Sequence, residues 1–252
     1  EEPLASSDDV TYIINQANRV LEPTLRREQV IGVFAGLRPL VSTDPDSPTT
    51  KLSREHVVDS PTQGFVSIAG GKYTTYRVMS EDAVNEAINH MRKIVPDSAT
   101  ETLAIIGAEG YSVLMNQIPR LAQRFGISES SVEHLLNRYG SLMDEVLEPV
   151  QGDSTLLEPL MPTLPYLKAE ILYSVTHEGA RSVDDVLSRR TRIAFEAHDQ
   201  GLSVVAEVAE LISPILGWSA AEKKNSIAEY KDIIERQNAE LQELKKNNSK
   251  VS

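Results

Sequence analysis

The residues best suited to chemistry lie in one short stretch, residues 64–77, which reads Gly-Phe-Val-Ser-Ile-Ala-Gly-Gly-Lys-Tyr-Thr-Thr-Tyr-Arg. Gly70 and Gly71 can adopt a positive φ and bring the backbone close to a ligand that any Cβ would hold away. Lys72 adds a positive charge, and Thr74 and Thr75 are natural N-cap residues for a following helix. A helix N-terminus offers unpaired N–H groups and a partial positive charge, which suit an anion or an electron-rich oxygen. On these residues alone, a tight turn with a surface lysine is an equally good interpretation.

Two arginines could extend such an anion site. Arg38 lies inside the apolar, strand-like residues 33–41, which read Val-Phe-Ala-Gly-Leu-Arg-Pro-Leu-Val. An unpaired charge is costly to bury, so Arg38 must pair with either an internal carboxylate or an anionic ligand. The sequence supports these two interpretations equally. The planar guanidinium suits a phosphate or carboxylate. Arg54, within residues 52–56 (Leu-Ser-Arg-Glu-His), is by default a solvated surface arginine.

Other catalytic and metal-binding patterns are missing from the sequence. It has no cysteine, and its five histidines show no metal-ligand spacing such as His-x3-His. It contains neither a Gly-x-Ser-x-Gly elbow nor a Gly-x-Gly-x-x-Gly loop. We therefore expect no metal site and no thiolate nucleophile.

A small basic cluster stands out in this acidic chain: Arg189, Arg190 and Arg192. Nearby carboxylates offer internal partners, namely Asp184, Asp185 and Glu196. Internal pairing is the favoured interpretation, and contact with anionic lipid headgroups is the alternative. The role of the cluster stays open at this point.

A strand, a turn and a helix must hold the chemistry-bearing stretch in place. Val66 and Ile68 are β-branched and lie in a run too short for a helix, so we expect a buried strand before the glycines. Small and apolar residues then continue at helical spacing to about residue 88, which predicts a helix.

The segments upstream of this stretch mix helix and strand. Ser6 and Asp9 have the spacing of a capping box, which predicts the start of a helix. Residues 30–41 and 51–59 are predicted strands, and the Pro- and Asp-rich residues 43–50 are a predicted loop.

From about residue 111 the character of the sequence changes. Apolar residues recur at helical spacing in almost every segment, and prolines separate the segments. The predicted helices include residues 118–125, 132–139, 183–197 (begun by Ser182), 202–216 and a last helix capped by Ser219. The change places a domain boundary near residues 96–103. We expect three parts: residues 1–97 with strands and helices, an all-helical domain over residues 103–240, and a polar tail over residues 241–252.

Composition excludes several classes of function. The 252 residues carry a formal net charge of -12 and have a pI near 4.9, which argues against a nucleic-acid partner. The longest apolar run, residues 30–37, is far shorter than the ~20 residues of a membrane-spanning helix. We therefore expect any membrane contact to be peripheral. A signal peptide is not evident, and the Glu-Glu-Pro start hints at a processed or truncated product.

Four stretches of the sequence together are specific to one family. They are residues 33–41 and 52–56 as written above, residues 67–77 (Ser-Ile-Ala-Gly-Gly-Lys-Tyr-Thr-Thr-Tyr-Arg) and residues 169–180 (Ala-Glu-Ile-Leu-Tyr-Ser-Val-Thr-His-Glu-Gly-Ala), followed by residues 185–192 (Asp-Val-Leu-Ser-Arg-Arg-Thr-Arg). In this order and spacing the chain closely resembles the FAD-dependent glycerol-3-phosphate dehydrogenases, from about residue 5 to residue 235. Tyr73 departs from the small or aliphatic residue expected there in many relatives.

The resemblance covers only the C-terminal part of such an enzyme. Family members begin with a Rossmann-like unit whose Gly-x-Gly-x-x-Gly holds the FAD pyrophosphate, and this chain has none. The implied fold class is α+β followed by all-α: a mixed strand–helix remnant of an FAD- and substrate-binding domain over residues 1–97, then the helical C-terminal domain. The family histidine that assists proton removal also lies upstream, so no histidine here inherits that role.

The resemblance also implies roles for individual residues. Arg38 and Arg54 would bind the substrate phosphate and neighbouring oxygens. The residues that would border the flavin ring and ribityl chain are Gly70, Gly71, Lys72, Thr74 and Thr75. Lys72, the catalytic residue implied here, would lie close to the substrate and to the pyrimidine edge of the flavin. Hydride would pass from C2 of glycerol 3-phosphate to flavin N5, leaving negative charge that Lys72 and helix-terminal N–H groups stabilise.

Three interpretations of function follow from these observations. In the first, the parent enzyme oxidises glycerol 3-phosphate to dihydroxyacetone phosphate and passes electrons to a membrane quinone. In the second, it is an oxidase that passes them to oxygen and makes hydrogen peroxide; the short connection from Asp59 to Gly64 favours the dehydrogenase. In the third, residues 103–240 are a non-catalytic helical module that binds a partner or the membrane surface.

The first interpretation carries expectations about the surroundings of the protein. The implied partners are glycerol 3-phosphate, quinone and the membrane surface, at the cytoplasmic, inner face of the cell membrane. A homodimer is one of the oligomeric states that the sequence leaves open. We expect the 252-residue chain alone neither to retain FAD nor to turn over substrate.

Overall fold

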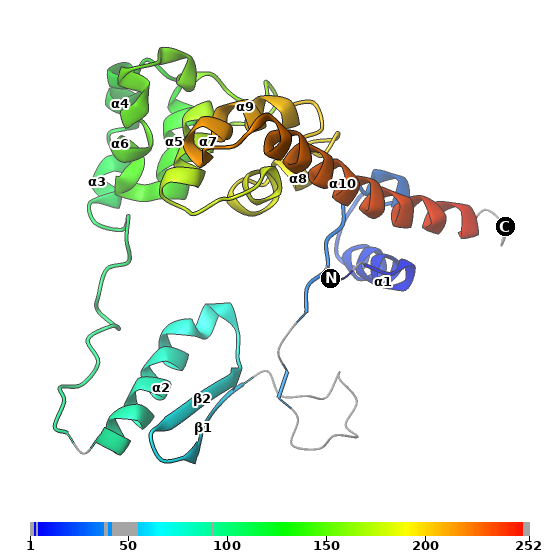
Figure 1. The fold of residues 1–252 in the computed structure, drawn as a ribbon. Coiled ribbons are helices and arrows are strands. Elements are labelled where there is room, and N and C mark those ends of the chain that lie inside the picture. Colours follow the sequence, from blue (N-terminus) through cyan, green and yellow to red (C-terminus); the bar gives the residue numbers. More distant parts are fainter. Residues whose placement is uncertain (1–2, 4, 38–39, 42–54, 92, 249–252) are drawn as a thin grey trace. The chain divides into compact units, whose positions relative to one another are not determined.

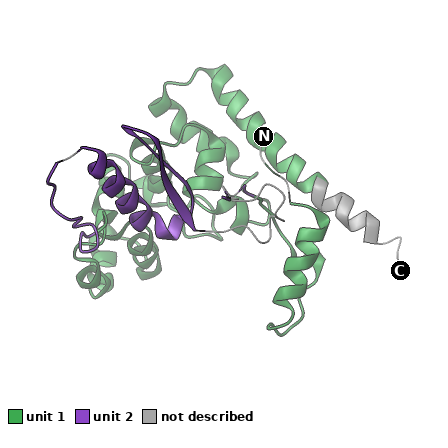
Figure 2. Ribbon diagram, turned by 90° about the horizontal axis from the view of Figure 1, so that it is seen from below, with its two compact units in different colours: residues 1–35, 105–252 green, residues 36–104 purple. Residues whose placement is uncertain are grey.

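The computed structural model describes residues 3, 5–37, 40–41, 55–91 and 93–248 of the chain. It divides the chain into two compact units (Figure 2). Unit 1 comprises residues 1–35 and 105–252, and unit 2 comprises residues 36–104.

Unit 2 contains a two-stranded hairpin and one helix that packs against it (Figure 1). Strand β1 (His56–Thr62) pairs antiparallel with β2 (Phe65–Gly70). A 3-10 turn (Tyr73–Thr75) leads into α2 (Tyr76–Met91). The expected strand, turn and helix around the glycines are therefore confirmed. The expected burial of the strand is wrong, because no residue of β2 is buried and Ile68 is 40% exposed.

Unit 1 is built from helices (Figure 1). Its α-helices are α1 (Ser7–Ala17), α3 (Tyr111–Met115), α4 (Ile118–Phe125), α5 (Glu129–Tyr139), α6 (Met143–Val146), α7 (Lys168–Thr176), α8 (Ile193–Glu196), α9 (Val205–Leu216) and α10 (Ala220–Asn248). Short 3-10 turns lie at Arg27–Gln29, Gly140–Leu142, Glu148–Gln151 and Ser154–Leu157. The expected fold class, a mixed strand–helix part followed by a helical domain, is confirmed.

Two hydrophobic clusters form the core of unit 1. The first gathers side chains of α4, α5 and α6 around the fully buried Val132 and Leu135. The second gathers side chains of α8, α9 and α10 around the fully buried Ile212 and Tyr230. Helix α7 contributes to both clusters, which explains why it is apolar on nearly all sides.

A polar junction joins the two clusters at Glu170 of α7, a residue with no exposed surface. Its Oε1 accepts a hydrogen bond of 2.8 Å from Leu167 N–H, and its Oε2 accepts one of 3.1 Å from the Tyr139 hydroxyl. His134 Nε2 lies 3.0 Å from Oε1, and Arg138 Nε forms an ion pair with Oε2 at 3.2 Å. A buried carboxylate needs such partners because its desolvation is otherwise too costly.

A π-helical turn interrupts the helix expected after Ser182. That residue caps the segment as expected, since its Oγ accepts a hydrogen bond of 3.0 Å from Asp185 N–H. Residues Asp185–Arg190 then form a π-helix, in which Thr191 N–H donates to Val186 O at 2.8 Å. The continuous helix predicted to Ala197 is therefore wrong, because helical periodicity alone does not distinguish an inserted π turn.

The first 35 residues pack differently from the domain boundaries expected from sequence. The sequence predicts one domain over residues 1–97, whereas residues 1–35 belong to unit 1. Val10 of α1 is only 5% exposed, and α1 contacts α10. This packing joins segments far apart in the sequence, so local composition carries no sign of it. At the other end, α10 runs to Asn248, into the residues expected as a polar tail.

The strand expected over residues 30–41 does not form in its described part. Residues 30–37 have no regular secondary structure. A strand needs a hydrogen-bonding partner, and the sheet among the described residues contains β1 and β2 alone.

Among the described residues, no helix combines the length and the apolar character needed to span a membrane.

Candidate functional site

The candidate site is the turn that joins β2 to α2. Gly70 and Gly71 have φ angles of 77° and 80°, in the left-handed region that favours glycine. A Cβ on Gly70 would lie 2.6 Å from Glu55 O, so the backbone just before β1 blocks any side chain there. A Cβ on Gly71 would lie 2.5 Å from the flexible Met79 Sδ and 3.2 Å from His56 Cβ. The glycines are thus explained by close packing within unit 2, and their contact with a ligand stays a prediction.

The 3-10 turn after Gly71 is closed by reciprocal hydrogen bonds between Lys72 and Thr75. Lys72 N–H donates to Thr75 Oγ1 at 3.3 Å, and the Thr75 hydroxyl donates to Lys72 O at 3.0 Å. Lys72 is therefore the N-cap residue. The expectation that Thr74 or Thr75 takes that place is wrong, because the helix begins one turn earlier as a 3-10 turn.

This arrangement leaves a cation and two backbone donors at the start of the helix. Lys72, Tyr73 and Thr74 are exposed, and Tyr73 is 90% exposed. The first N–H groups of a helix have no partner within it. Among the described residues, no carboxylate pairs with the Lys72 ammonium group. The turn can therefore stabilise negative charge on a bound ligand.

An aromatic pair lies beside the lysine. The rings of Tyr73 and Tyr76 stack with centroids 5.8 Å apart and an angle of 26° between their planes. Tyr73 is the position at which the family resemblance leads us to expect a small or aliphatic residue. Its ring adds a flat apolar surface next to Lys72.

Polar links between β1 and α2 position the turn, and sequence reasoning missed them. His56 Nε2 lies 2.7 Å from Asp82 Oδ2, and the Ser60 hydroxyl donates to Glu86 Oε1 at 2.8 Å. His56 faces Gly70 across the hairpin. The sequence does contain a signal: His56 and Ser60 are four residues apart, as are Asp82 and Glu86. That the first pair contacts the second becomes evident only in the fold.

The other candidate residues fall outside this geometry. Arg38 and Arg54 lie outside the described residues, so the structure neither brings them to the turn nor separates them from it. Arg189 of the basic cluster is paired with Asp184 and Asp185, which confirms the internal pairing favoured for it. Arg190 Nε donates to Glu178 O at 2.8 Å. The described residues contain no group of three or more carboxylates and histidines placed to hold a metal ion.

Comparison with known proteins assigns the chain to a family. Residues 98–223, half of the chain, match the family model described as the C-terminal domain of alpha-glycerophosphate oxidase. The chain belongs to this family. The family resemblance expected from its motifs is therefore confirmed.

Similar proteins carry a related name. Glycerol-3-phosphate dehydrogenase 2 of Mycobacterium tuberculosis is 43% identical over 233 residues, which are 92% of this chain and 40% of that protein. The mitochondrial glycerol-3-phosphate dehydrogenase of Rattus norvegicus is 33% identical over 237 residues, 89% of this chain and 31% of that protein. The chain thus spans about two fifths or less of the length of these curated relatives.

A solved structure shares the fold. The X-ray structure of glycerol-3-phosphate dehydrogenase from Bacillus halodurans complexed with FAD superimposes with a TM-score of 0.72 at 24% identity. The match covers 91% of this chain and 45% of that protein. At this coverage the match includes most of unit 2 as well as the helical domain.

The turn fits one edge of a flavin by its chemistry. Lys72 and the N–H groups of Tyr73 and Thr74 are donors with no acceptor among the described residues. A flavin carries electron-rich oxygen and nitrogen atoms along its pyrimidine edge, which need such donors. The fit rests on these donors, since the space beside the two glycines is filled by the chain itself.

Proposed function

We propose that this chain is the C-terminal part of a flavoenzyme that uses FAD to oxidise glycerol 3-phosphate to dihydroxyacetone phosphate. Its family membership and the names of its relatives support the proposal. The observation that carries it is the turn between β2 and α2, where Lys72 and free N–H groups face solvent beside two left-handed glycines. A module that only binds a partner would not need this group of donors.

Each residue of the proposed site has a distinct task. Arg38 and Arg54 bind the phosphate and neighbouring oxygens of the substrate, since a guanidinium matches phosphate geometry. FAD, when bound, supplies the hydride acceptor. Lys72 and the N–H groups of the turn stabilise negative charge at the flavin edge. Residues bordering the flavin are Gly70, Gly71, Lys72, Thr74 and Thr75.

The proposed electron acceptor is a membrane quinone. Thr62 pairs directly with Phe65, so the hairpin turn holds Gln63 and Gly64 alone and carries no insertion. The absence of an insertion at this turn favours a dehydrogenase over an oxidase. The name of the matched family keeps an oxidase, which would reduce oxygen to hydrogen peroxide, as the second candidate.

The location and assembly of the protein follow from the proposed acceptor. Delivery of electrons to a membrane quinone requires contact with the membrane surface, so we place the enzyme at the cytoplasmic face of the cell membrane as a peripheral protein. We also propose a homodimer as the oligomeric state to test.

The proposal is tested in the complete protein that contains this chain. We expect oxidation of glycerol 3-phosphate with a soluble quinone analogue and little hydrogen peroxide. Arg38→Ala should raise KM for glycerol 3-phosphate about tenfold or more, because a charge-assisted bond to phosphate is lost. Near-normal kinetics in this variant would remove the role assigned to Arg38. Stoichiometric peroxide would favour the oxidase.

A further inference from the structure

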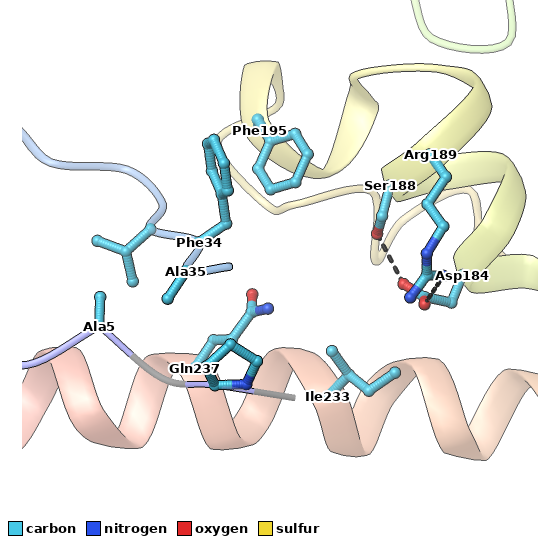
Figure 3. A pocket seen from close by; sticks show the side chains of 11 residues that line it. Ala5, Phe34, Ala35, Asp184, Ser188, Arg189, Phe195, Ile233 and Gln237 are labelled. Atoms are coloured by element: carbon cyan, nitrogen blue, oxygen red, sulfur yellow. Dashed lines mark hydrogen bonds and ion pairs between the residues drawn. The ribbon is translucent and has the colours of Figure 1, made fainter. Parts of the chain in front are cut away.

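The N-terminal stretch of unit 1 forms a hairpin whose two ends meet at α10. Ala5, just before α1, and Ala35, the last residue of the stretch, both line a pocket of about 290 Å³ beside Ile233 of α10 (Figure 3). Helix α1 has 11 residues and rises about 16 Å from this point, at about 1.5 Å per residue. The chain then turns and comes back beside α1, and Figure 2 shows this hairpin projecting from unit 1. We call its outer end, residues 19–26, the hairpin tip.

Side-chain hydrogen bonds hold the hairpin in shape. Asn18 closes the turn, because its Nδ2 donates to Leu25 O at 2.9 Å and its Oδ1 accepts from Leu25 N–H at 2.7 Å. On the returning chain, the Arg27 guanidinium donates to Thr11 Oγ1 at 3.0 Å and to Ser7 Oγ at 3.1 Å. The hairpin tip is therefore shaped in advance, and little entropy is lost when it contacts another surface.

The apolar side chains of the hairpin tip face solvent. Val20 is 83% exposed, Leu21 47% and Leu25 37%. Such an exposed group on a projecting element marks a contact surface. Three apolar side chains are too few for a stable protein–protein interface, which takes about 20–30 residues a side. Insertion of a few apolar side chains into the headgroup region instead suits a lipid surface.

Two arginines flank these apolar side chains. Arg19 and Arg26 are exposed, and among the described residues no carboxylate pairs with their guanidinium groups. Residues 18–28 carry three arginines and two glutamates, a net charge of +1, in a chain whose net charge is -12. The acidic chain as a whole is repelled by anionic lipid headgroups, whereas the hairpin tip can approach them. The long arginine side chains can lie along the apolar boundary while their charged ends stay at the phosphates.

We propose that the hairpin tip docks the enzyme on an anionic lipid surface. Val20 and Leu21 insert at the boundary between headgroups and acyl chains, and Arg19 and Arg26 bind lipid phosphates. The inference rests on the proposed function, because electron delivery to a membrane quinone requires such contact, and it names the surface that makes it. Arg189, the other basic residue considered for lipid contact, is paired with carboxylates of its own chain.

The test is co-sedimentation of the complete protein with vesicles of phosphatidylcholine and phosphatidylglycerol in equal parts. Val20→Asp should lower the partition coefficient about tenfold or more, because a charge replaces an inserted apolar side chain. Arg19→Gln and Arg26→Gln should each lower it about fivefold, and should have no effect with vesicles of phosphatidylcholine alone. The matched control is Val113→Asp, which places the same charge at an exposed valine of α3 and should not change binding.

Turnover with a soluble quinone analogue separates this inference from the proposed function. All four variants should keep the kcat and the KM of the unaltered protein, because none of them lies in the proposed site. A complete protein that does not oxidise glycerol 3-phosphate would overturn the proposed function, whatever its vesicle binding.

Three results would overturn the docking role alone in an active enzyme. The first is an unaltered protein that does not bind the vesicles. The second is a Val20→Asp variant that binds them as tightly as the unaltered protein or the Val113→Asp control. The third is a Tm of Val20→Asp that falls in the absence of vesicles, because it would show that the hairpin tip packs against the rest of the complete protein.

Discussion

The fold disfavours the charged form of the Glu178 side chain. Its Oε2 atom is buried and has no hydrogen-bond partner in the part of the chain that the structure describes. Burial raises the pKa of this carboxyl above its ordinary value of 4.5, and the positive charges of Arg138 and Arg190 offset the effect only in part. The folded state therefore binds the Glu178 proton more tightly than the unfolded chain does.

This linkage predicts that Glu178→Gln increases the thermal stability of the protein in a pH-dependent way. For a raised carboxyl pKa, the free energy of unfolding falls as pH rises from below 4.5 through the folded-state pKa, and the penalty is complete above it. Glutamine removes the penalty, so Tm should rise at neutral pH, with about 2–4 °C for each kcal/mol in a chain of this size. Thermal unfolding at several pH values measures it. The difference should vanish well below pH 4.5. A lower Tm at neutral pH would contradict the assignment.

Single residues were predictable from sequence where their partners are close in the chain. Ser6 and Asp9 form the expected capping box, with Asp9 N–H donating to Ser6 Oγ at 3.2 Å. Glu170 and Tyr139 were not predictable as partners, because 31 residues separate them. Lys72 was singled out by its neighbours, but its place as the N-cap depends on turn geometry that residue types do not specify.

At the scale of elements, α7 holds the two hydrophobic clusters of unit 1 together. The guanidinium of Arg138 lies over the rings of Tyr139 and Tyr166, at 5.3 and 5.2 Å from their centroids. Tyr139 belongs to the first cluster and Tyr166 to the second. Glu170 anchors this arginine, so the polar junction couples the packing of both clusters.

Removal of Glu170 should therefore be costly. Glu170→Ala leaves Arg138 without its carboxylate and should lower the free energy of unfolding by about 3–5 kcal/mol. Glu158→Ala is the matched control, since Glu158 forms its ion pair with Lys168 at the surface, where such a pair contributes about 0–1 kcal/mol. Denaturant unfolding of both variants gives the comparison. Equal losses would show that the junction does not support the core.

The order of elements was largely predictable, and their interruptions were not. Hydrophobic periodicity identified α4, α5, α9 and α10, because an amphipathic helix records its buried face in its own sequence. The π-helix Asp185–Arg190 and the irregular residues 30–37 depend on contacts with distant segments. The expected strand failed for the same reason, since strand-like residues form a strand only beside a partner.

At the scale of the whole molecule, unit 2 exposes apolar side chains on its hairpin. Val57, Phe65 and Ile68 are 46%, 54% and 40% exposed. The curated relatives are more than twice as long as the stretch they share with this chain. We infer that further sequence in the complete protein binds most of the flavin. The turn between β2 and α2 would contact only one edge of it.

The most direct measurement is an anaerobic titration of the complete protein with glycerol 3-phosphate, followed by the visible absorbance of its flavin. The account predicts that the oxidised-flavin absorbance is lost on addition of substrate, and that the 252-residue chain alone purifies without flavin. A complete protein whose flavin stays oxidised in excess glycerol 3-phosphate would contradict the account, as would a 252-residue chain that retains FAD and is reduced by this substrate.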